Sequence, residues 1–225
     1  MTRVAVYELV RELDWAKYSV ESAKKNAGMD FEFFGVGWNN PDETRDWLIE
    51  QGYFFTKFPE TENNYENLYT GWRMGFEISD ADIVVPIAGD MVFHKNWLKN
   101  LVAHSTPKNI VNCHLIERGA LPSYHHCKDF GIPPNFRELD FQLYAKSLSR
   151  DSVQEIPEQL TAKPYACWRE TYLQLGGEPK EIINGVTGDV FFIRKAMQNG
   201  VKMLRANNSI VYHFQRQAIK KDIGR

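Results

Sequence analysis

This 225-residue chain contains the run DIVVPI at Asp82–Ile87, in which every residue after the aspartate is apolar. A strand that is apolar on both faces has to be covered on both faces, which is typical of a central strand in a parallel sheet. Parallel strands need crossover connections, and these are usually helices. The run therefore predicts an α/β fold with helices on both sides of a sheet.

The first half of the chain alternates strand-like and helix-like segments around this run. We expect strands at 3–10, 31–36, 53–58 and 82–87, and helices at 14–27, 41–52 and 65–78. Asp14 is expected to cap the first helix and Pro41 to open the second, because aspartate favours the N-cap and proline the first helical position. Such an alternation implies right-handed crossovers in an open, mostly parallel sheet.

The second half is less regular. Residues 107–164 are rich in Pro, Gly, His and Ser, which predicts loops or short elements that shape a cleft. Helices are expected at 168–175 and 189–198, and two closing strands at 202–204 and 209–214. The sequence shows no internal repeat, low-complexity stretch or linker, so we expect a single domain.

Composition and missing motifs exclude several classes of protein. Lys and Arg number 27 against 29 Asp and Glu, so no overall positive field attracts nucleic acid or anionic lipid. Three widely spaced cysteines do not form a disulfide framework, and no leader or bilayer-spanning run occurs, so we expect a soluble cytoplasmic protein. The fingerprints of Rossmann dehydrogenases and P-loop proteins and the serine elbow of most α/β hydrolases are absent.

Two groups of residues have several interpretations. His125, His126 and Cys127 are of the types that bind zinc, but adjacent histidines and the lack of a Cys-x-x-Cys pair favour an acceptor-facing loop. The tail carries four basic residues, Arg216, Lys220, Lys221 and Arg225. We expect such a tail to be solvated; the alternatives are that it clamps a diphosphate or contacts the phosphates of a nucleic-acid acceptor.

The segment NLYTGWRMGFEISDADIVVPIAGDMVFHKNWLKNL resembles the nucleotide-sugar half of family-two glycosyltransferases. In an α/β sheet ligands bind beyond the carboxyl ends of the strands, and Asp90 follows the buried strand directly. The resemblance implies that Asp90 holds a divalent ion that neutralises the departing diphosphate. The family pattern is Asp-x-Asp, whereas this chain has Ala88-Gly89-Asp90. Asp90 alternatively opens a turn or caps the helix near Trp97.

The segment WRETYLQLGGEPKEIINGVTGDVFFIRKAMQNGVKMLRANNSIVYHF resembles the acceptor half of the same family. It implies that Asp189 takes the proton of the acceptor hydroxyl and that His213 completes metal or diphosphate binding. The family often has Glu-Asp where this chain has Gly188-Asp189. The alternatives are that Asp189 is a helix N-cap and that His213 is an ordinary residue at a strand end.

The resemblance also implies nucleotide contacts, which come from several separate segments of the first half of the chain. Glu8 would meet the base or ribose, Asn39 and Asp42 would lie in the turn after the second strand, and Arg73 would reach the diphosphate. Each also has a structural interpretation. Glu8 would be a surface strand residue, the turn would simply start a helix at Pro41, and Arg73 would lie on a solvated helix face.

Together these features predict one GT-A-type α/β domain, with a nucleotide-sugar half at 1–105 and an acceptor half with a basic tail at 106–225. The implied activity is an inverting hexosyl or pentosyl transfer from a UDP-type nucleotide-sugar, with Mn²⁺ or Mg²⁺, to a hydroxyl of a glycan, a protein or a modified DNA base. A non-catalytic sugar-nucleotide or glycan-binding module is the alternative. A nucleotidyltransferase ranks third, because residues 8–14 lack the glycine-rich basic loop it needs.

Overall fold

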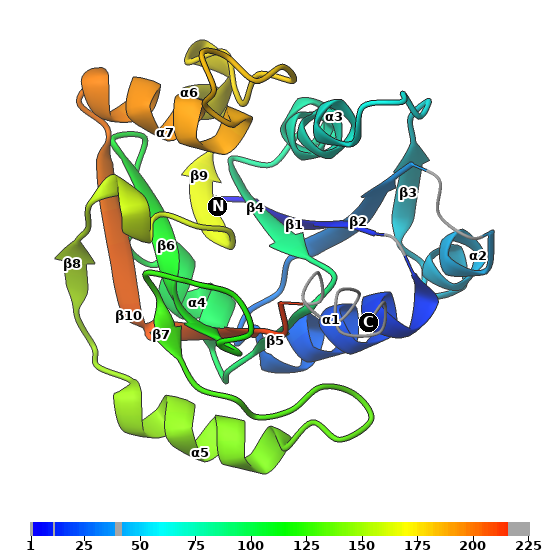
Figure 1. Ribbon diagram of the computed structural model, residues 1–225, viewed down its shortest axis with the longest axis vertical. Helices are drawn as coiled ribbons and strands as arrows, with labels where there is room; N and C mark the ends of the chain where they lie inside the picture. The colour runs from blue at the N-terminus through cyan, green and yellow to red at the C-terminus, as the bar shows by residue number, and fades with distance from the viewer. Residues whose placement is uncertain (1, 11, 39–41, 216–225) are drawn as a thin grey trace.

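The computed structural model describes residues 2–10, 12–38 and 42–215, and a ten-stranded sheet forms the centre of the molecule (Figure 1). The strand order is β3-β2-β1-β4-β9-β6-β10-β5, with β7 paired to β6 and β8 paired to β10. The strands are β1 (Val4–Leu9), β2 (Glu32–Gly37), β3 (Phe54–Lys57), β4 (Ile83–Ala88), β5 (Met91–Phe93), β6 (Asn109–Glu117), β7 (His126–Cys127), β8 (Val153–Glu155), β9 (Tyr165–Trp168) and β10 (Lys202–His213). The helices are α1 (Leu13–Asn26), α2 (Asp42–Glu50), α3 (Asn64–Ile78), α4 (Trp97–Val102), α5 (Glu138–Leu148), α6 (Arg169–Gln174) and α7 (Gly188–Gln198), and Glu158–Leu160 forms a 3-10 turn.

The first half of the chain is the predicted parallel α/β unit. Strands β1, β2, β3 and β4 pair in parallel, and β4 lies in the middle of the sheet as its apolar sequence predicts. One local prediction is wrong: α1 begins at Leu13, so Asp14 lies in the first turn and does not cap the helix. A carboxylate there still interacts favourably with the helix dipole. The predicted start at Pro41 lies outside the described residues, and α2 is described from Asp42.

The second half contains more regular structure than the sequence predicts. The stretch expected to form loops holds the nine-residue strand β6 and the eleven-residue helix α5. The two closing strands are one twelve-residue strand, β10, whose pairing with β6 shifts register between Ala206 and Ile210. Strand β9 runs antiparallel to both β4 and β6, so β4, β6 and β10 all point in the same direction.

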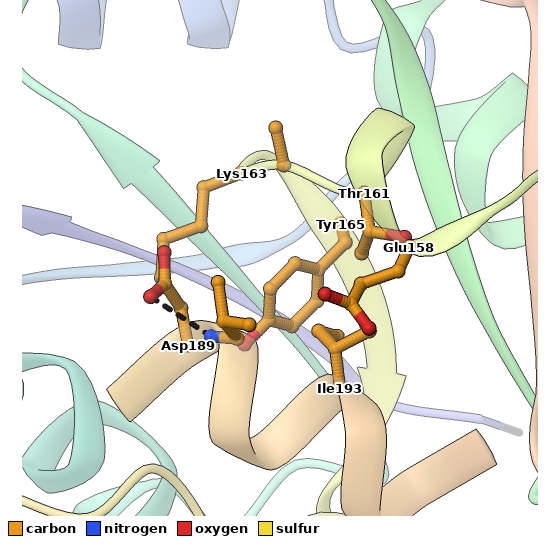
Figure 2. A pocket seen from close by; sticks show the side chains of 8 residues that line it. Glu158, Thr161, Lys163, Tyr165, Asp189 and Ile193 are labelled. Carbon is orange, nitrogen blue, oxygen red and sulfur yellow. Dashed lines mark hydrogen bonds between the residues drawn. The ribbon is translucent and has the colours of Figure 1, made fainter. Parts of the chain in front are cut away.

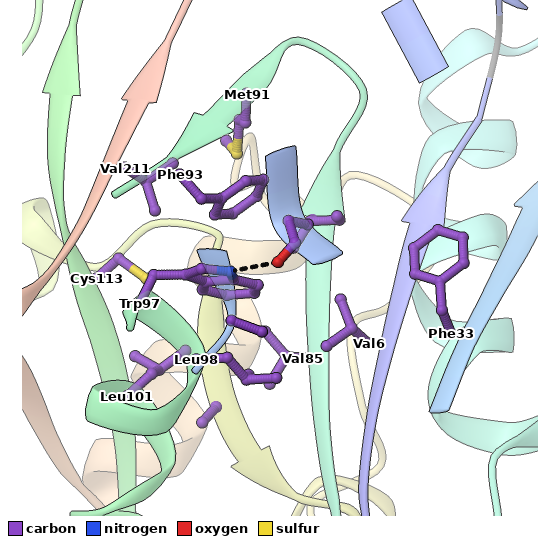
Figure 3. Close-up of a cluster of buried hydrophobic side chains, with 14 of the residues drawn as sticks. Val6, Phe33, Val85, Met91, Phe93, Trp97, Leu98, Leu101, Cys113 and Val211 are labelled. Atoms are coloured by element: carbon purple, nitrogen blue, oxygen red, sulfur yellow. Dashed lines mark hydrogen bonds between the residues drawn. The ribbon is translucent and has the colours of Figure 1, made fainter. Parts of the chain in front are cut away.

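Helices cover both faces of the sheet (Figure 1). On one face α1, α2 and α4 enclose a core in which Trp97 is fully buried and donates its indole N–H to the carbonyl of Ala23 at 3.0 Å (Figure 3). On the other face α3, α6 and α7 pack over a second core that includes Phe76, Tyr172 and Phe192. Helix α5 closes a third cluster at the end of β10. No helix of the described residues has the length and apolar character needed to cross a bilayer.

Candidate active site

The carboxyl ends of three parallel strands bring an acid, a histidine and a second acid together. Asp90 follows β4, Glu117 ends β6 and His213 ends β10. Strand β5 folds back antiparallel along β10 and pairs Met91 with His213, and the Phe214 amide donates to the Asp90 carbonyl at 3.0 Å. Two predicted site residues, Asp90 and His213, are therefore neighbours although they are 123 positions apart in the sequence.

The ring of His213 lies between two carboxylates. Its Nε2 is 3.1 Å from Asp90 Oδ2 and its Nδ1 is 3.1 Å from Glu117 Oε1. Burial acts to lower the pKa of His213, but the charges and hydrogen bonds of the two acids raise it to about 10. Gln215 donates its amide to the other oxygen of Glu117 at 2.8 Å and fixes that carboxylate in turn.

These residues fit a divalent metal. An imidazole nitrogen and a carboxylate oxygen 3.1 Å apart are both common metal ligands, and a carboxylate on the far ring nitrogen orients metal-binding histidines in many proteins. A metal at Nε2 would replace the proton held there. Across the described residues no three His, Cys, Asp or Glu side chains form a complete metal site, so Asp90 and His213 would supply part of the coordination shell. A diphosphate and water can supply the rest, as is usual for Mg²⁺.

Glu8 lies beside this group in the core. Its side chain has no exposed surface, and neither carboxylate oxygen has a hydrogen-bond partner. Burial raises the pKa of Glu8 well above its usual value. The nearby Ser19 hydroxyl acts to lower this pKa but has the smaller effect, and the negative charge of Asp90 raises it further. The interpretation of Glu8 as a surface strand residue is therefore wrong, while its contact with a nucleotide stays a prediction.

Asp189 lies in a second cluster, in the first turn of α7. Its Oδ1 accepts from the Tyr69 hydroxyl at 2.8 Å and from the Val190 amide at 2.9 Å. Burial acts to raise the pKa of Asp189, but the charge of Lys163 and hydrogen bonds from Thr187 and Tyr69 lower it below the usual value. The residue at the N-cap position is Thr187, so the interpretation of Asp189 as the N-cap is wrong.

A small pocket opens in front of Asp189 (Figure 2). Lys163 lies beside Asp189 there, and its ammonium is 2.7 Å from Glu178 Oε1, which also accepts from the Tyr165 hydroxyl at 2.9 Å. The ammonium also lies 4.8 Å from the centre of the Trp72 ring. Burial raises the pKa of Glu178 although Lys163 acts to lower it. The residues that line the pocket are Glu158, Thr161, Ala162, Lys163, Tyr165, Asp189, Val190 and Ile193.

Both clusters lie toward the same edge of the sheet. Because β9 is antiparallel to β4 and β6, its first residue, Tyr165, and the preceding Lys163 lie toward the carboxyl ends of those two strands. Asp90 and His213 occupy that same edge. The fold therefore directs the predicted base and the predicted metal ligands to one side of the sheet.

The remaining predicted contacts lie elsewhere or outside the described residues. Arg73 pairs with Glu77 at 2.6 Å and donates to the Gly176 carbonyl at 3.4 Å, and Asp42 pairs with Arg45 at 3.0 Å in the first turn of α2. Asn39 and the basic tail are not among the described residues. The nucleotide contacts of these residues stay predictions.

The histidine-rich loop forms a third group, at strand β7. His126 hydrogen-bonds to the Tyr144 hydroxyl of α5, and its ring centre lies 6.4 Å from that of His114. Burial lowers the pKa of His114 to about 4, with Arg205 adding to the effect. That this loop faces an acceptor stays a prediction.

Sequence reasoning missed Glu117, Lys163 and Glu178. Glu117 ends the segment NIVNCHLIE, whose apolar residues are interrupted by polar ones, so its signal is weaker than the one that identified Asp90. Lys163 and Glu178 carry no comparable signal. They are 15 residues apart and meet only because β9 and α6 bring the two ends of their segment together.

Comparisons with solved structures identify the fold. GalNAc-T7 with UDP, GalNAc and Mn²⁺ superposes with a TM-score of 0.69 at 12% identity, over 95% of this chain and 44% of that one. S. aureus TarS 1–349 gives 0.64 at 13% identity over 98% and 63%. The mannosyltransferase PcManGT of Pyrobaculum calidifontis, with GDP-Man and Mn²⁺, gives 0.63 at 16% identity over 99% and 64%.

The chain thus spans between 44% and 64% of the length of these structures. No family profile and no curated protein sequence matches it. At 12–16% identity the likeness concerns the fold and leaves the reaction open. The chain has the GT-A fold of these glycosyltransferases.

Proposed function

We propose that this protein is a glycosyltransferase that moves a hexosyl or pentosyl group from a nucleotide-sugar to an acceptor hydroxyl. The observation that carries the proposal is the Asp90–His213 pair at the carboxyl edge of the sheet. Two of the similar structures hold a nucleotide or nucleotide-sugar together with Mn²⁺. In the proposal, residues 1–105 bind a UDP-type donor and residues 106–225 bind the acceptor, which is a glycan, a protein or a hydroxylated DNA base.

Asp90 and His213 would hold Mn²⁺ or Mg²⁺, and this ion would stabilise the negative charge of the leaving diphosphate. Glu117 contributes by orienting the imidazole through Nδ1. His213 is protonated when the metal is absent, so it also offers a positive charge to a diphosphate in that state.

Asp189 would act as the general base. Its pKa lies below the usual value, so it is ionised at neutral pH and can accept a proton. As the acceptor oxygen bonds to the anomeric carbon, its proton moves to Asp189 and the electron pair of the breaking carbon–oxygen bond leaves with the diphosphate. A single displacement of this kind inverts the configuration of the sugar.

A turnover assay tests the proposal. The protein is incubated with UDP- and GDP-sugars, Mn²⁺ and candidate acceptors, and the released nucleoside diphosphate is measured. We expect Asp189→Asn to lower turnover by about 10²–10⁴-fold, the usual contribution of general base catalysis, with donor binding retained. Asp30→Asn, in the exposed connection before β2, is the control and should leave turnover unchanged.

The outcomes separate the alternatives. Donor binding without turnover toward any acceptor, or turnover that Asp189→Asn does not change, would contradict the assignment of Asp189 and favour a non-catalytic sugar-nucleotide module. Release of pyrophosphate from a nucleoside triphosphate and a sugar phosphate would identify a nucleotidyltransferase.

A further inference from the structure

Strand β1 carries one side chain that apolar packing does not explain. Alternate residues of this segment, Val4, Val6 and Val10, belong to the core under α1, and Glu8 occupies the remaining place in the series. It is as completely buried as the valines beside it. A buried carboxylate without hydrogen bonds is costly in free energy, and an unmatched group of this kind commonly marks a functional role or an absent ion.

The position of Glu8 points to its role. Strands β1 and β4 are in parallel register with Glu8 opposite Ile87, so the Glu8 carboxylate lies beside the turn that leads to Asp90. A methyl group added at Gly89 would lie 3.0 Å from Glu8 Oε1. The absence of a side chain at Gly89 therefore leaves room for this carboxylate next to the turn.

Glu8 and Asp90 place two carboxyl groups next to one turn. Asp90 is the one acid of the Ala88-Gly89-Asp90 turn itself, and Glu8 lies beside Gly89 from the neighbouring strand. A divalent cation next to Asp90 and His213 would attract both carboxyl groups. We propose that Glu8 supplies, from the neighbouring strand, a second carboxylate for this cation.

Glu8 acts on the cation from outside its direct ligands. Within the described parts of the chain, Glu8, Asp90 and His213 do not converge as a three-ligand site. Glu8 therefore acts through its charge and through a hydrogen bond to metal-bound water, and outer groups of this kind commonly change metal affinity by 10- to 100-fold. The inference rests on the proposed function, because it needs the cation held by Asp90 and His213.

Mn²⁺ binding, measured by the electron paramagnetic resonance signal of free Mn²⁺, tests the inference without an activity assay. We expect Glu8→Gln to weaken Mn²⁺ binding about 10-fold or more, in the presence and absence of UDP. Glu8→Met, which is apolar and suits a core position, should show the same loss and replaces the first variant if that does not fold. The double variant of Glu178→Gln with Lys163→Met is the matched control, since it removes an equally buried carboxyl group away from Asp90 without leaving Lys163 uncompensated, and it should bind Mn²⁺ as the wild type does.

Unfolding in chelator provides the second readout. We expect Glu8→Met without metal to be at least as stable as the wild type, because the variant replaces a buried carboxyl group that makes no hydrogen bond with an apolar side chain. Wild-type Mn²⁺ affinity in both Glu8 variants, with binding lost in Asp90→Asn, would overturn the inference and leave the proposed function intact. A wild type that binds neither Mn²⁺ nor any nucleoside diphosphate would overturn both.

Discussion

His213 is held in its charged form by the two acids on either side of it. Asp90 and Glu117 each lie 3.1 Å from one ring nitrogen, and the pKa of His213 is raised to about 10. In the unfolded chain a histidine has a pKa near 6.5. Between these two values His213 therefore binds one proton in the folded protein that it does not bind in the unfolded chain.

This difference predicts how stability depends on pH. In chelator, the contribution of His213 is fully present below about pH 6.5 and is lost as the pH rises to about 10. Between these limits the free energy of unfolding of the wild type should fall by about 1.4 kcal/mol per pH unit relative to His213→Gln. Urea unfolding of both proteins at several pH values measures this difference, and a difference that does not change with pH would contradict the charged state of His213.

Lys163 and Glu178 form the other charged pair near the edge of the sheet, with only 12% and 1% of their side chains exposed. Removing one member of a buried pair leaves the other charge uncompensated. We therefore expect Lys163→Met to lower the free energy of unfolding by about 3–5 kcal/mol, and the double variant with Glu178→Gln to recover most of that loss. Urea unfolding measures both, and equal stability of the single and double variants would contradict the pairing.

At the residue scale, the position of a polar side chain after an apolar run predicted two of the candidate site residues. Asp90 and His213 follow or end such runs, and the structure places them together. Glu117 ends a strand of mixed polarity, and it was missed because residues 107–164 were interpreted as loops or short elements. The partners of Asp189 were not predictable, because Tyr69 comes from α3 and lies 120 positions away.

At the scale of elements, regular α/β segments were predicted to within a few residues and mixed-polarity segments were not. Strand β6 contains Asn112, which looks unsuited to a central strand but is buried and bonds to the Leu204 carbonyl and the Ala162 amide. Helix α5 buries only Phe141 and Ala145 of its eleven residues, so its apolar periodicity is weak. In both cases tertiary contacts, absent from any local pattern, stabilise the element.

Helix α4 is short, and its anchor is Trp97. This side chain is fully buried against Phe93 and bonds to the Ala23 carbonyl of α1 (Figure 3). We expect Trp97→Ala to lower the free energy of unfolding by about 3–5 kcal/mol, the usual cost of such a cavity. Ile49→Ala, at a side chain that is 57% exposed on α2, should change it by less than about 0.5 kcal/mol. If urea unfolding showed the same loss of stability for Trp97→Ala and Ile49→Ala, the placement of Trp97 in the core would be contradicted.

At the scale of the whole molecule, the sheet joins both halves of the chain and positions the candidate site residues. Strand β4 of the first half and strands β6 and β10 of the second run in the same direction. The side chains at their carboxyl ends, Asp90, Glu117 and His213, therefore lie at the same edge of the sheet. The mostly parallel α/β fold was predictable because its first half repeats a simple alternation. The antiparallel insertion of β9 was not, because four residues carry too little pattern.

Thermal unfolding with a panel of nucleotide-sugars and nucleoside diphosphates, each with and without Mn²⁺, tests whether Asp90 and His213 hold a metal together with a donor. A ligand that binds the native state raises the unfolding midpoint by mass action. We expect one donor to raise the midpoint only when Mn²⁺ is present, and we expect this rise to disappear in Asp90→Ala. No rise with any donor, or a rise that neither Mn²⁺ nor Asp90→Ala affects, would contradict the proposed metal and donor site.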